Sequence, residues 1–283
     1  MRFAKWQALG NDYVIVEQPD LPFELTPARV RALCAPHSGV AADGVLLLSE
    51  PADGHALARL RVFNPDGSEA EVSGNGAREA VLYLRRRGWT VEDAFAIETA
   101  AGVLRARITS PTACTLELGR ARLQSEDFPS GDDGGRGTVA AGGRTWSFQH
   151  VQVGNPQCAI RVPDDAALAV LPLAEIGPDI ECSELFPNRT NVSWFAPLAP
   201  DRIRARIFER GVGETFASGT GATGAAVAHV LEGGSSPVTV VLDGGELQIT
   251  VGAQLEISLS GWAVPVFAGE LADELVEELR AID

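Results

Sequence analysis

Alternating hydrophobic and polar side chains predict strands in two distant parts of the chain. Residues 58–63 and 203–208 each place an apolar side chain at every second position, with arginines between them. A period of two is typical of strands with one buried face. Two short apolar runs, at 14–16 and 158–162, come shortly after Gly-Asn pairs and predict buried strands.

Two helices are predicted, each after a Ser-Gly-x-Gly turn. The first covers residues 74–87: its apolar side chains form one stripe, arginines fill its last turn, and Gly88 is a stop signal. The second covers residues 222–231 and carries almost no charge. A helix of small apolar residues is usually covered on every side, so we expect both helices to be central to an α+β fold.

Composition and spacing predict two further segments. Residues 130–143 are rich in glycine and have no apolar period, which predicts a mobile loop or a hairpin tip. Near the C-terminus, Leu271, Leu275, Val276 and Leu279 follow helical spacing. They predict a terminal helix from about residue 271 to residue 282, and we assign residues 264–283 to the C-terminal helix.

The chain also matches itself. Shifting it by 145 residues places residues 61–80 on residues 206–225 without a gap, and eight of the twenty pairs are identical, including Ser73 with Ser218. A shift of 144 pairs the Gly-Asn at residue 10 with the Gly-Asn at residue 154. Two matches at nearly one shift indicate an ancient duplication, with two similar halves.

Composition narrows the class of protein. The chain has 283 residues, 45% of them hydrophobic, and a formal net charge of -15. A chain this acidic is unsuited to nucleic acid or to an anionic membrane surface. No apolar run reaches the length of a transmembrane helix, and the N-terminus turns polar too early for a secretory signal. We therefore expect a cytoplasmic protein.

The cysteines and histidines predict neither a disulfide framework nor a metal site. Cys34, Cys114, Cys158 and Cys182 are widely separated and form no CxxC pair, so most are interpreted as buried reduced thiols. The four histidines include no HxH or HxxxH pair. We expect no metal and no cofactor.

Ser73 and Ser218 are the candidate centres of chemistry. A serine before a helix is most often only an N-cap. The glycines after each serine, however, let a ligand approach the first-turn N–H groups, which carry partial positive charge and favour an anion. Two such turns related by duplication suit a two-base racemase, in which one group removes an α-proton and the other returns it on the opposite face.

Polar residues gather around both turns. Arg210 and the asparagines suit a second carboxylate or an amine at the far end of a substrate. For Glu69 and Glu214, a capping or structural role is at least as good an interpretation, because both precede a helix start by a few residues. The polar set is Asn11, Asn64, Asp66, Glu69, Asn155, Asn191, Glu209, Arg210 and Glu214.

The run GTGATG at residues 219–224 also satisfies the dinucleotide fingerprint GxGxxG. That fingerprint requires a strand running directly into its first glycine. Here the predicted strand ends near Phe208, and a polar loop follows it. The sequence therefore disfavours a dinucleotide site.

Six motifs occur in the order and spacing found in diaminopimelate epimerases. They are GNDYVIVE, AADGVLLL, FNPDGSEAEVSGNGAR, GNPQC, RTNVSWF and FERGVGETFASGTGA. The chain resembles this family over about residues 3–265. The resemblance implies an isomerase, independent of pyridoxal phosphate, that converts LL- to meso-diaminopimelate for lysine and peptidoglycan precursors.

The resemblance also implies a fold and a set of site residues. The fold would have two similar lobes, each wrapping strands around a central helix: residues 1–120 with 264–283, and residues 121–263, with the active site between them. The small-molecule partner would be a diaminopimelate-like amino acid, and a homodimer is the candidate assembly. The implied substrate contacts are Asn11, Asn64, Asn155, Asn191, Glu209 and Arg210, with the amides of Gly74, Asn75, Gly219 and Thr220 on the α-carboxylate.

This chain departs from the family at the chemistry. Ser73 and Ser218 stand where the family has its two catalytic cysteines, and Gln157 stands where the family has the histidine of GNPHC. A thiol titrates near pH ~8.5 and supplies a thiolate, whereas a serine hydroxyl needs a strong base beside it. Glu209 is the candidate base.

Several interpretations of the two serines stay open. A laboratory Cys→Ser pair would not also be expected to change the histidine, so a natural variant fits better. Such a variant could be an epimerase whose serines are activated by a carboxylate, another racemase or a dehydratase, or a protein that only binds an amino acid. Proline-related members of the superfamily resemble this case, since some carry serine or threonine at one of the two positions.

Overall fold

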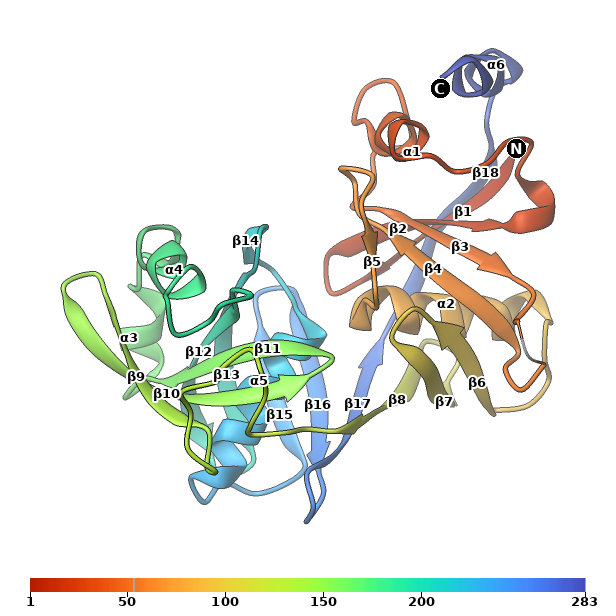
Figure 1. Cartoon of the computed structure of the whole chain (residues 1–283). Coiled ribbons are helices and arrows are strands. Elements are labelled where there is room, and N and C mark those ends of the chain that lie inside the picture. Colours follow the sequence, from red (N-terminus) through yellow and green to blue (C-terminus); the bar gives the residue numbers. More distant parts are fainter. Residues whose placement is uncertain (53, 283) are drawn as a thin grey trace. The chain divides into compact units, whose positions relative to one another are not determined.

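A computed structural model describes residues 1–52 and 54–282 and divides the chain into two compact units. Unit 1 contains Met1–Leu116 and the segment that begins at Gly261, and unit 2 is Glu117–Ser260. Strands β8 (Ala113–Arg120) and β17 (Glu256–Trp262) each contain a boundary between units (Figure 1). No helix among the described residues has the length and apolar character needed to span a membrane.

Unit 1 is a sheet with helices. The C-terminal strand β18 returns to pair with β1, next to β2. Its strands are β1 (Arg2–Ala8), β2 (Asn11–Glu17), β3 (Val45–Ser49), β4 (Ala58–Phe63), β5 (Glu69–Ala70), β6 (Ala94–Thr99), β7 (Gly102–Ser110) and β18 (Val264–Glu270). Its helices are the short η1 (Gln18–Asp20), α1 (Pro27–Cys34), α2 (Gly74–Arg87) and α6 (Asp273–Ala281).

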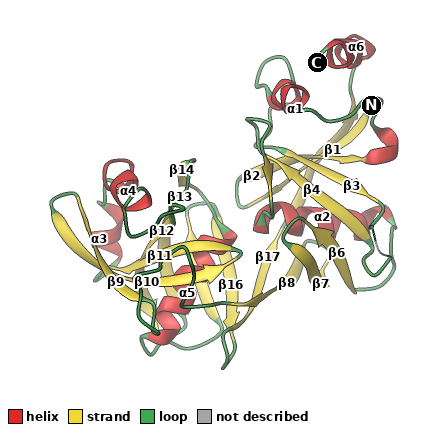
Figure 2. Ribbon diagram, in the orientation of Figure 1, coloured by secondary structure: helices red, strands yellow, loops and turns green. Residues whose placement is uncertain are grey.

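Unit 2 has the same mixture of strands and helices (Figure 2). Its strands are β9 (Arg136–Ala141), β10 (Arg144–Val153), β11 (Asn155–Arg161), β12 (Asn191–Ala199), β13 (Arg202–Glu209), β14 (Gly213–Thr215), β15 (Val238–Leu242) and β16 (Gly245–Val251). Its helices are α3 (Asp165–Ala169), α4 (Leu173–Glu181) and α5 (Gly219–Leu231).

The strands pair in the same sequence in both units. In unit 1, β2 pairs parallel with β3, β3 antiparallel with β4, and β4 parallel with β6. In unit 2, β11 pairs parallel with β12, β12 antiparallel with β13, and β13 parallel with β15. The predicted α+β class is confirmed, and the shared topology is what a duplicated chain would produce.

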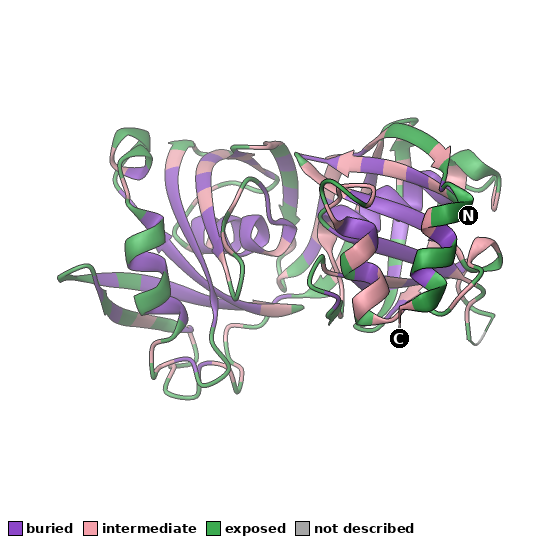
Figure 3. Cartoon of the chain, turned by 90° about the horizontal axis from the view of Figure 1, so that it is seen from above, coloured by how far each residue is buried: buried purple, intermediate pink, exposed green. Residues whose placement is uncertain are grey.

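Each unit packs its strands around one long helix. Helix α2 contacts β1, β2, β3, β4, β7 and β18, and α5 contacts β10, β11, β12, β13, β15 and β16. Figure 3 shows α5 as a buried ribbon among the strands of its unit. Helix α2 has the predicted bounds, with Ser73 as its N-cap and Gly88 left-handed at its C-cap (φ 78°). Helix α5 begins at Gly219, three residues before the predicted start.

The structure refines two predictions. Residues 130–143, predicted to be a mobile loop or a hairpin tip, contain a hairpin: residues 136–141 form strand β9, which pairs antiparallel with β10 around Gly142 and Gly143, so only the residues before β9 are loop. Residues 264–270, placed in the terminal helix, form β18, and α6 begins only at Asp273. In both segments the strand is stabilised by hydrogen bonds from a partner strand, which the local sequence cannot predict.

Each unit has its own hydrophobic core. In unit 1, Val14, Val45, Phe63 and Leu279 belong to one cluster, which places α6 against the sheet. In unit 2, a larger cluster surrounds Trp194 of β12. Of the four cysteines, all without disulfides, three are buried, and Cys182 is exposed.

Candidate active site

The Ser73 turn is held by backbone and by a tyrosine. The Ser73 Oγ accepts a hydrogen bond from the Gly76 N–H at 3.1 Å, which caps α2. The Tyr13 hydroxyl, from β2, donates to the same Oγ at 3.2 Å. The first turn of α2 packs closely on β3, because a Cβ at Gly76 would lie 2.9 Å from the Leu46 side chain. Ser73 is thus an N-cap whose hydroxyl also has a phenol as partner.

Two predicted substrate contacts meet in the first turn of α2. The Asn75 Nδ2 donates to Asn11 Oδ1 at 3.2 Å. The Arg78 guanidinium donates to Asn75 Oδ1 at 2.6 Å and to the Gly74 carbonyl at 2.9 Å. Arg78 is fully buried, and this burial lowers the pKa of its guanidinium to about 10. The buried cation orients Asn75 and adds positive charge at a helix end that already favours anions.

The loop after β4 holds its polar residues by local bonds. The Asn64 Nδ2 donates to Ser68 Oγ at 2.9 Å, and Asp66 accepts from both the backbone and the side chain of Ser68. These bonds hold the pKa of the Asp66 carboxyl below its usual value. Glu69 forms a two-bond ion pair with Arg61 of β4, at 2.8 Å for each bond. The structure therefore favours the structural interpretation of Glu69.

The Ser218 turn has a carboxylate as its partner. The Ser218 Oγ accepts from the Gly221 N–H at 3.3 Å and donates to Glu209 Oε2 at 3.0 Å. The other Glu209 oxygen accepts from the Thr215 hydroxyl at 2.8 Å. Burial raises the pKa of Glu209 above its usual value, and the two hydroxyl donors partly offset this. The arrangement places a hydroxyl in contact with a carboxylate whose affinity for a proton is increased.

Asn191 and Arg210 lie together beside this turn. The Arg210 backbone N–H donates to Asn191 Oδ1 at 2.7 Å, while the Arg210 side chain donates to the Asn188 carbonyl at 2.8 Å. The Asn191 Nδ2 is buried and has no hydrogen-bond partner within the described part of the chain. A buried amide donor without an acceptor is costly, so this group is available to a ligand oxygen.

Asn155 and Gln157 are neighbours at the start of β11. The Gln157 Nε2 donates to Asn155 Oδ1 at 2.5 Å, and Gln157 is fully buried. Helix α5 packs directly on Gln157, because a Cβ at Gly224 would lie 2.7 Å from its Cβ. Gln157 thus orients Asn155 and fills space against the central helix.

Unit 2 repeats the ion pair of unit 1. Glu214 pairs with Arg206 of β13 at 2.7 Å, as Glu69 pairs with Arg61, and this pairing favours a structural role for Glu214.

The strands around the Ser218 turn do not fit a dinucleotide site. Thr220 and Gly219 form the first turn of α5. The strand before this turn is the short β14, antiparallel to β13, whereas a dinucleotide fold has a parallel strand running into the glycines.

A second carboxylate, Glu79 of α2, is fully buried, and neither of its oxygens meets hydrogen-bond geometry with a described residue. Burial raises the pKa of this carboxyl well above its ordinary value of 4.5, and Arg78 and the Tyr13 backbone only partly offset the effect. Asp12 and Asp43 raise it further. Burial therefore favours the neutral form of this carboxyl over the charged one.

Glu79→Gln is expected to flatten the dependence of stability on pH. Because the folded pKa lies above the unfolded one, the unfolded state loses its proton first, and the free energy of unfolding falls as pH rises above about 4.5. Glutamine mimics the protonated carboxyl and does not titrate, so this fall, about 1.4 kcal/mol for each unit of pKa difference, is absent. Urea unfolding at pH 5 and pH 8 measures it. The exposed Glu92→Gln is the control, and equal slopes in wild type and Glu79→Gln would contradict the prediction.

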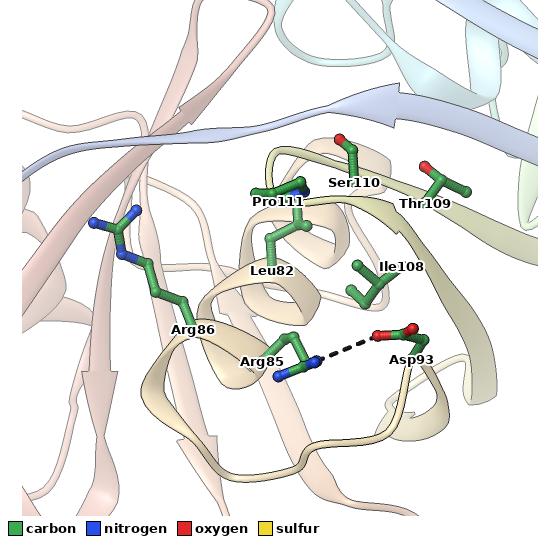
Figure 4. Close-up of a pocket in the computed structure, with 8 residues that line it drawn as sticks. All are labelled: Leu82, Arg85, Arg86, Asp93, Ile108, Thr109, Ser110 and Pro111. Carbon is green, nitrogen blue, oxygen red and sulfur yellow. Dashed lines mark hydrogen bonds and ion pairs between the residues drawn. The ribbon is translucent and has the colours of Figure 1, made fainter.

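Unit 1 also contains a hollow of about 540 Å³ (Figure 4). It lies at the C-terminal end of α2, beside the Arg85–Asp93 ion pair at 3.4 Å. Its lining residues are Leu82, Arg85, Arg86, Asp93, Ile108, Thr109, Ser110 and Pro111. Leu82 is nine residues along the helix from Ser73, about 14 Å at helical rise, so the hollow is separate from the serine turn.

Sequence reasoning missed two hydrogen-bond partners at the serine turns, one a tyrosine and the other a threonine. Tyr13 contacts Ser73 across 60 residues of chain, and Thr215 orients Glu209 from the neighbouring strand. The internal match offers one sequence signal for Tyr13, since the shift of 144 pairs it with Gln157, which stands at the position of the family's histidine. No group of three or more histidine, cysteine, aspartate or glutamate side chains suited to a metal occurs within residues 1–52 and 54–282.

Solved structures share the fold. A hydroxyproline epimerase from Agrobacterium vitis, with bound trans-4-hydroxy-L-proline, superposes with a TM-score of 0.67 at 15% identity, covering 95% of this chain and 91% of that one. A PhzF-family phenazine biosynthesis protein from Bacillus anthracis superposes with a TM-score of 0.67 at 17% identity, covering 96% and 99%. At these identities the likeness defines the fold class: the two-lobed α+β fold of these proteins.

Sequence comparison defines the family. The family profile described as diaminopimelate epimerase matches residues 3–124 and 149–264. The diaminopimelate epimerase of Magnetococcus marinus is 40% identical over 274 residues, covering 95% of this chain and 96% of the relative. That of Thioalkalivibrio sulfidiphilus is 36% identical over 277 residues, covering 96% and 99%. The chain belongs to the diaminopimelate epimerase family.

Proposed function

We propose that this protein inverts the α-carbon of LL-diaminopimelate to give meso-diaminopimelate by two-base proton transfer, without a cofactor. The observation that carries the proposal is the hydrogen bond from Ser218 Oγ to Glu209 at 3.0 Å. As Ser218 Oγ takes the α-proton, its own proton passes to the Glu209 carboxylate. Ser73, acting on the same carbon, returns a proton to the opposite face.

The proposal assigns to Ser73 and Ser218 the positions of the family's two cysteines, and to Gln157 the position of its histidine. A serine hydroxyl is a much weaker acid than a thiol, so it needs a base in contact with it. Glu209 supplies that base, because burial raises the pKa of its carboxyl and makes it a better proton acceptor.

In the same proposal, the helix N-termini hold the substrate α-carboxylate. The first-turn N–H groups of a helix have no acceptor within the helix and carry partial positive charge. Those of Gly74 and Asn75 in α2 and of Gly219 and Thr220 in α5 are assigned to this carboxylate. The buried Asn191 Nδ2 is a ready donor to a substrate oxygen.

Other polar groups are assigned to the far end of the substrate. They are Asn11, Asn64, Asn155 and Arg210, which bring amide groups and one guanidinium to an amine and a carboxylate. The proposal further includes a homodimer as the candidate assembly and a cytoplasmic location, the latter expected from the composition and apolar pattern of the sequence.

Isotope exchange tests the proposal. Incubated in heavy water, the protein is expected to introduce deuterium at the α-carbon of LL- and meso-diaminopimelate. Ser73→Ala/Ser218→Ala is expected to show no exchange above background. Ser73→Cys/Ser218→Cys is expected to exchange at least as fast as wild type, because a thiol titrates near pH ~8.5 and ionises without strong assistance.

Other results would select another function. Exchange in the double cysteine variant alone, with tight calorimetric binding of diaminopimelate by wild type, would identify an amino-acid-binding protein that kept the pocket and lost the bases. Exchange by wild type on a different amino acid, or release of water from a hydroxylated one, would identify another racemase or a dehydratase.

A further inference from the structure

The two serines have different partners although their turns are alike. Both cap a helix and both accept a glycine N–H, at 3.1 Å for Ser73 and 3.3 Å for Ser218. Ser218 then donates a hydrogen bond to a carboxylate, whereas Ser73 accepts a hydrogen bond from the Tyr13 phenol. Ser218 is therefore positioned to lose its proton to Glu209, whereas Ser73 has a proton donor, Tyr13, as its hydrogen-bond partner.

The duplication shows that each half has a partner that the other lacks. The shift of 145 that pairs the serines places Asn64 at the position of Glu209. The Asn64 amide bonds to Ser68 instead. The shift of 144 places Gln157, which bonds to Asn155, at the position of Tyr13. The asymmetry between the halves therefore comes from different residues at two pairs of equivalent positions: Tyr13 with Gln157, and Asn64 with Glu209.

Tyr13 is held firmly in place. It is 5% exposed, and its ring lies against Gly44, where an added Cβ would approach the ring at 2.6 Å and the Phe63 carbonyl at 2.3 Å. Only glycine at position 44 lets the ring occupy this place. A phenol is also a far stronger acid than an alkyl alcohol, so between the two hydroxyls the tyrosine is the natural donor.

We propose that Tyr13 is the proton-delivery partner of Ser73, as Glu209 is the proton-accepting partner of Ser218. The inference rests on the proposed function. As the Cα–H bond forms, the Ser73 O–H bond breaks, and the Tyr13 proton moves to Ser73 Oγ. The phenolate left on Tyr13 regains a proton from water, and Glu209 releases to water the proton taken through Ser218. In the reverse reaction, the same groups act in the opposite order.

Tyr13→Phe tests the proposal, because it removes the hydroxyl and keeps the ring against Gly44. We expect kcat for α-proton exchange to fall about ten- to a hundredfold, with KM changed less than about twofold. In a Ser73→Cys background, the same change should cost less than about threefold, since a thiol ionises by itself. Tyr83→Phe is the matched control: it removes a phenol of the same unit that bonds to Glu17, and kcat should be unchanged.

A loss that appears in KM alone, or that is as large with Cys at position 73, would overturn the relay and leave Tyr13 a structural or substrate-contacting residue. A measurement without turnover separates this inference from the proposed function. The chain has only two tyrosines, Tyr13 and Tyr83, so ring-labelled ¹³C-tyrosine gives two signals, assigned by Tyr13→Phe.

Ser73→Ala should move the Tyr13 ring-carbon signal and leave that of Tyr83 in place, while Ser218→Ala should move neither. A Tyr13 signal that does not respond to Ser73→Ala would overturn the proposal whatever the activity. If wild type exchanges no α-proton, the proposed function fails and the delivery role fails with it, even where the signal shows that the Tyr13–Ser73 bond is present.

Discussion

Glu209→Gln is expected to lower α-proton exchange about a hundred- to ten-thousandfold, the usual contribution of a general base. Glutamine can still accept the hydrogen bonds of Ser218 and Thr215 through its amide oxygen, but it cannot take the Ser218 proton. The side chain keeps its size, so the fold should be unaffected. The measurement is the initial rate of deuterium entry at saturating diaminopimelate.

The pH dependence sharpens this prediction. Wild type needs Glu209 ionised, and burial raises the pKa of this carboxyl, so the rate should rise with pH through a range above that of an ordinary glutamate. The Glu209→Gln variant should lack this rise. Glu214→Gln is the matched control, because Glu214 lies in β14, which pairs with the strand that carries Glu209, but its carboxylate pairs with Arg206. An equal loss of rate in both variants would contradict the role given to Glu209.

Trp194→Ala is expected to lower the free energy of unfolding of unit 2 by about 3–5 kcal/mol. Trp194 is fully buried in the middle of β12, and its ring meets that of Trp146 edge-on, with centroids 6.2 Å apart. Its removal leaves a cavity among side chains that close-packed strands on both sides prevent from collapsing. Hydrogen exchange in peptides of unit 2 across a denaturant series measures the loss.

A substitution at an exposed position is the control for the Trp194→Ala prediction. Val170 lies in the same unit and is 78% exposed, so Val170→Ala should change stability by less than about 0.5 kcal/mol. The peptides of unit 1 should keep their protection in Trp194→Ala, because Trp194 belongs to the core cluster of unit 2. Equal loss of protection in both units would show that they do not have separate cores.

Local signals explain which elements were predictable. Helix α2 has the predicted bounds because a serine cap, a last turn of arginines and a left-handed Gly88 all act within the segment itself. Helix α5 starts earlier than predicted because residues 219–221 have poor helix propensity, yet burial among six strands makes them helical. Strands β9 and β18 were missed because their hydrogen bonds come from β10 and β1.

The sequence by itself determined the duplication, the α+β class, the two Ser-Gly-x-Gly turns and the family. These are properties of order and spacing, which a chain carries whether or not it is folded. Only the tertiary structure decided which side chain is the hydrogen-bond partner of each serine hydroxyl. Tyr13 reaches Ser73 from another strand, and Glu209 reaches Ser218 from the end of β13. Hydroxyl acidity depends on such contacts, so the chemical character of each serine appears only when strands distant in sequence are brought together.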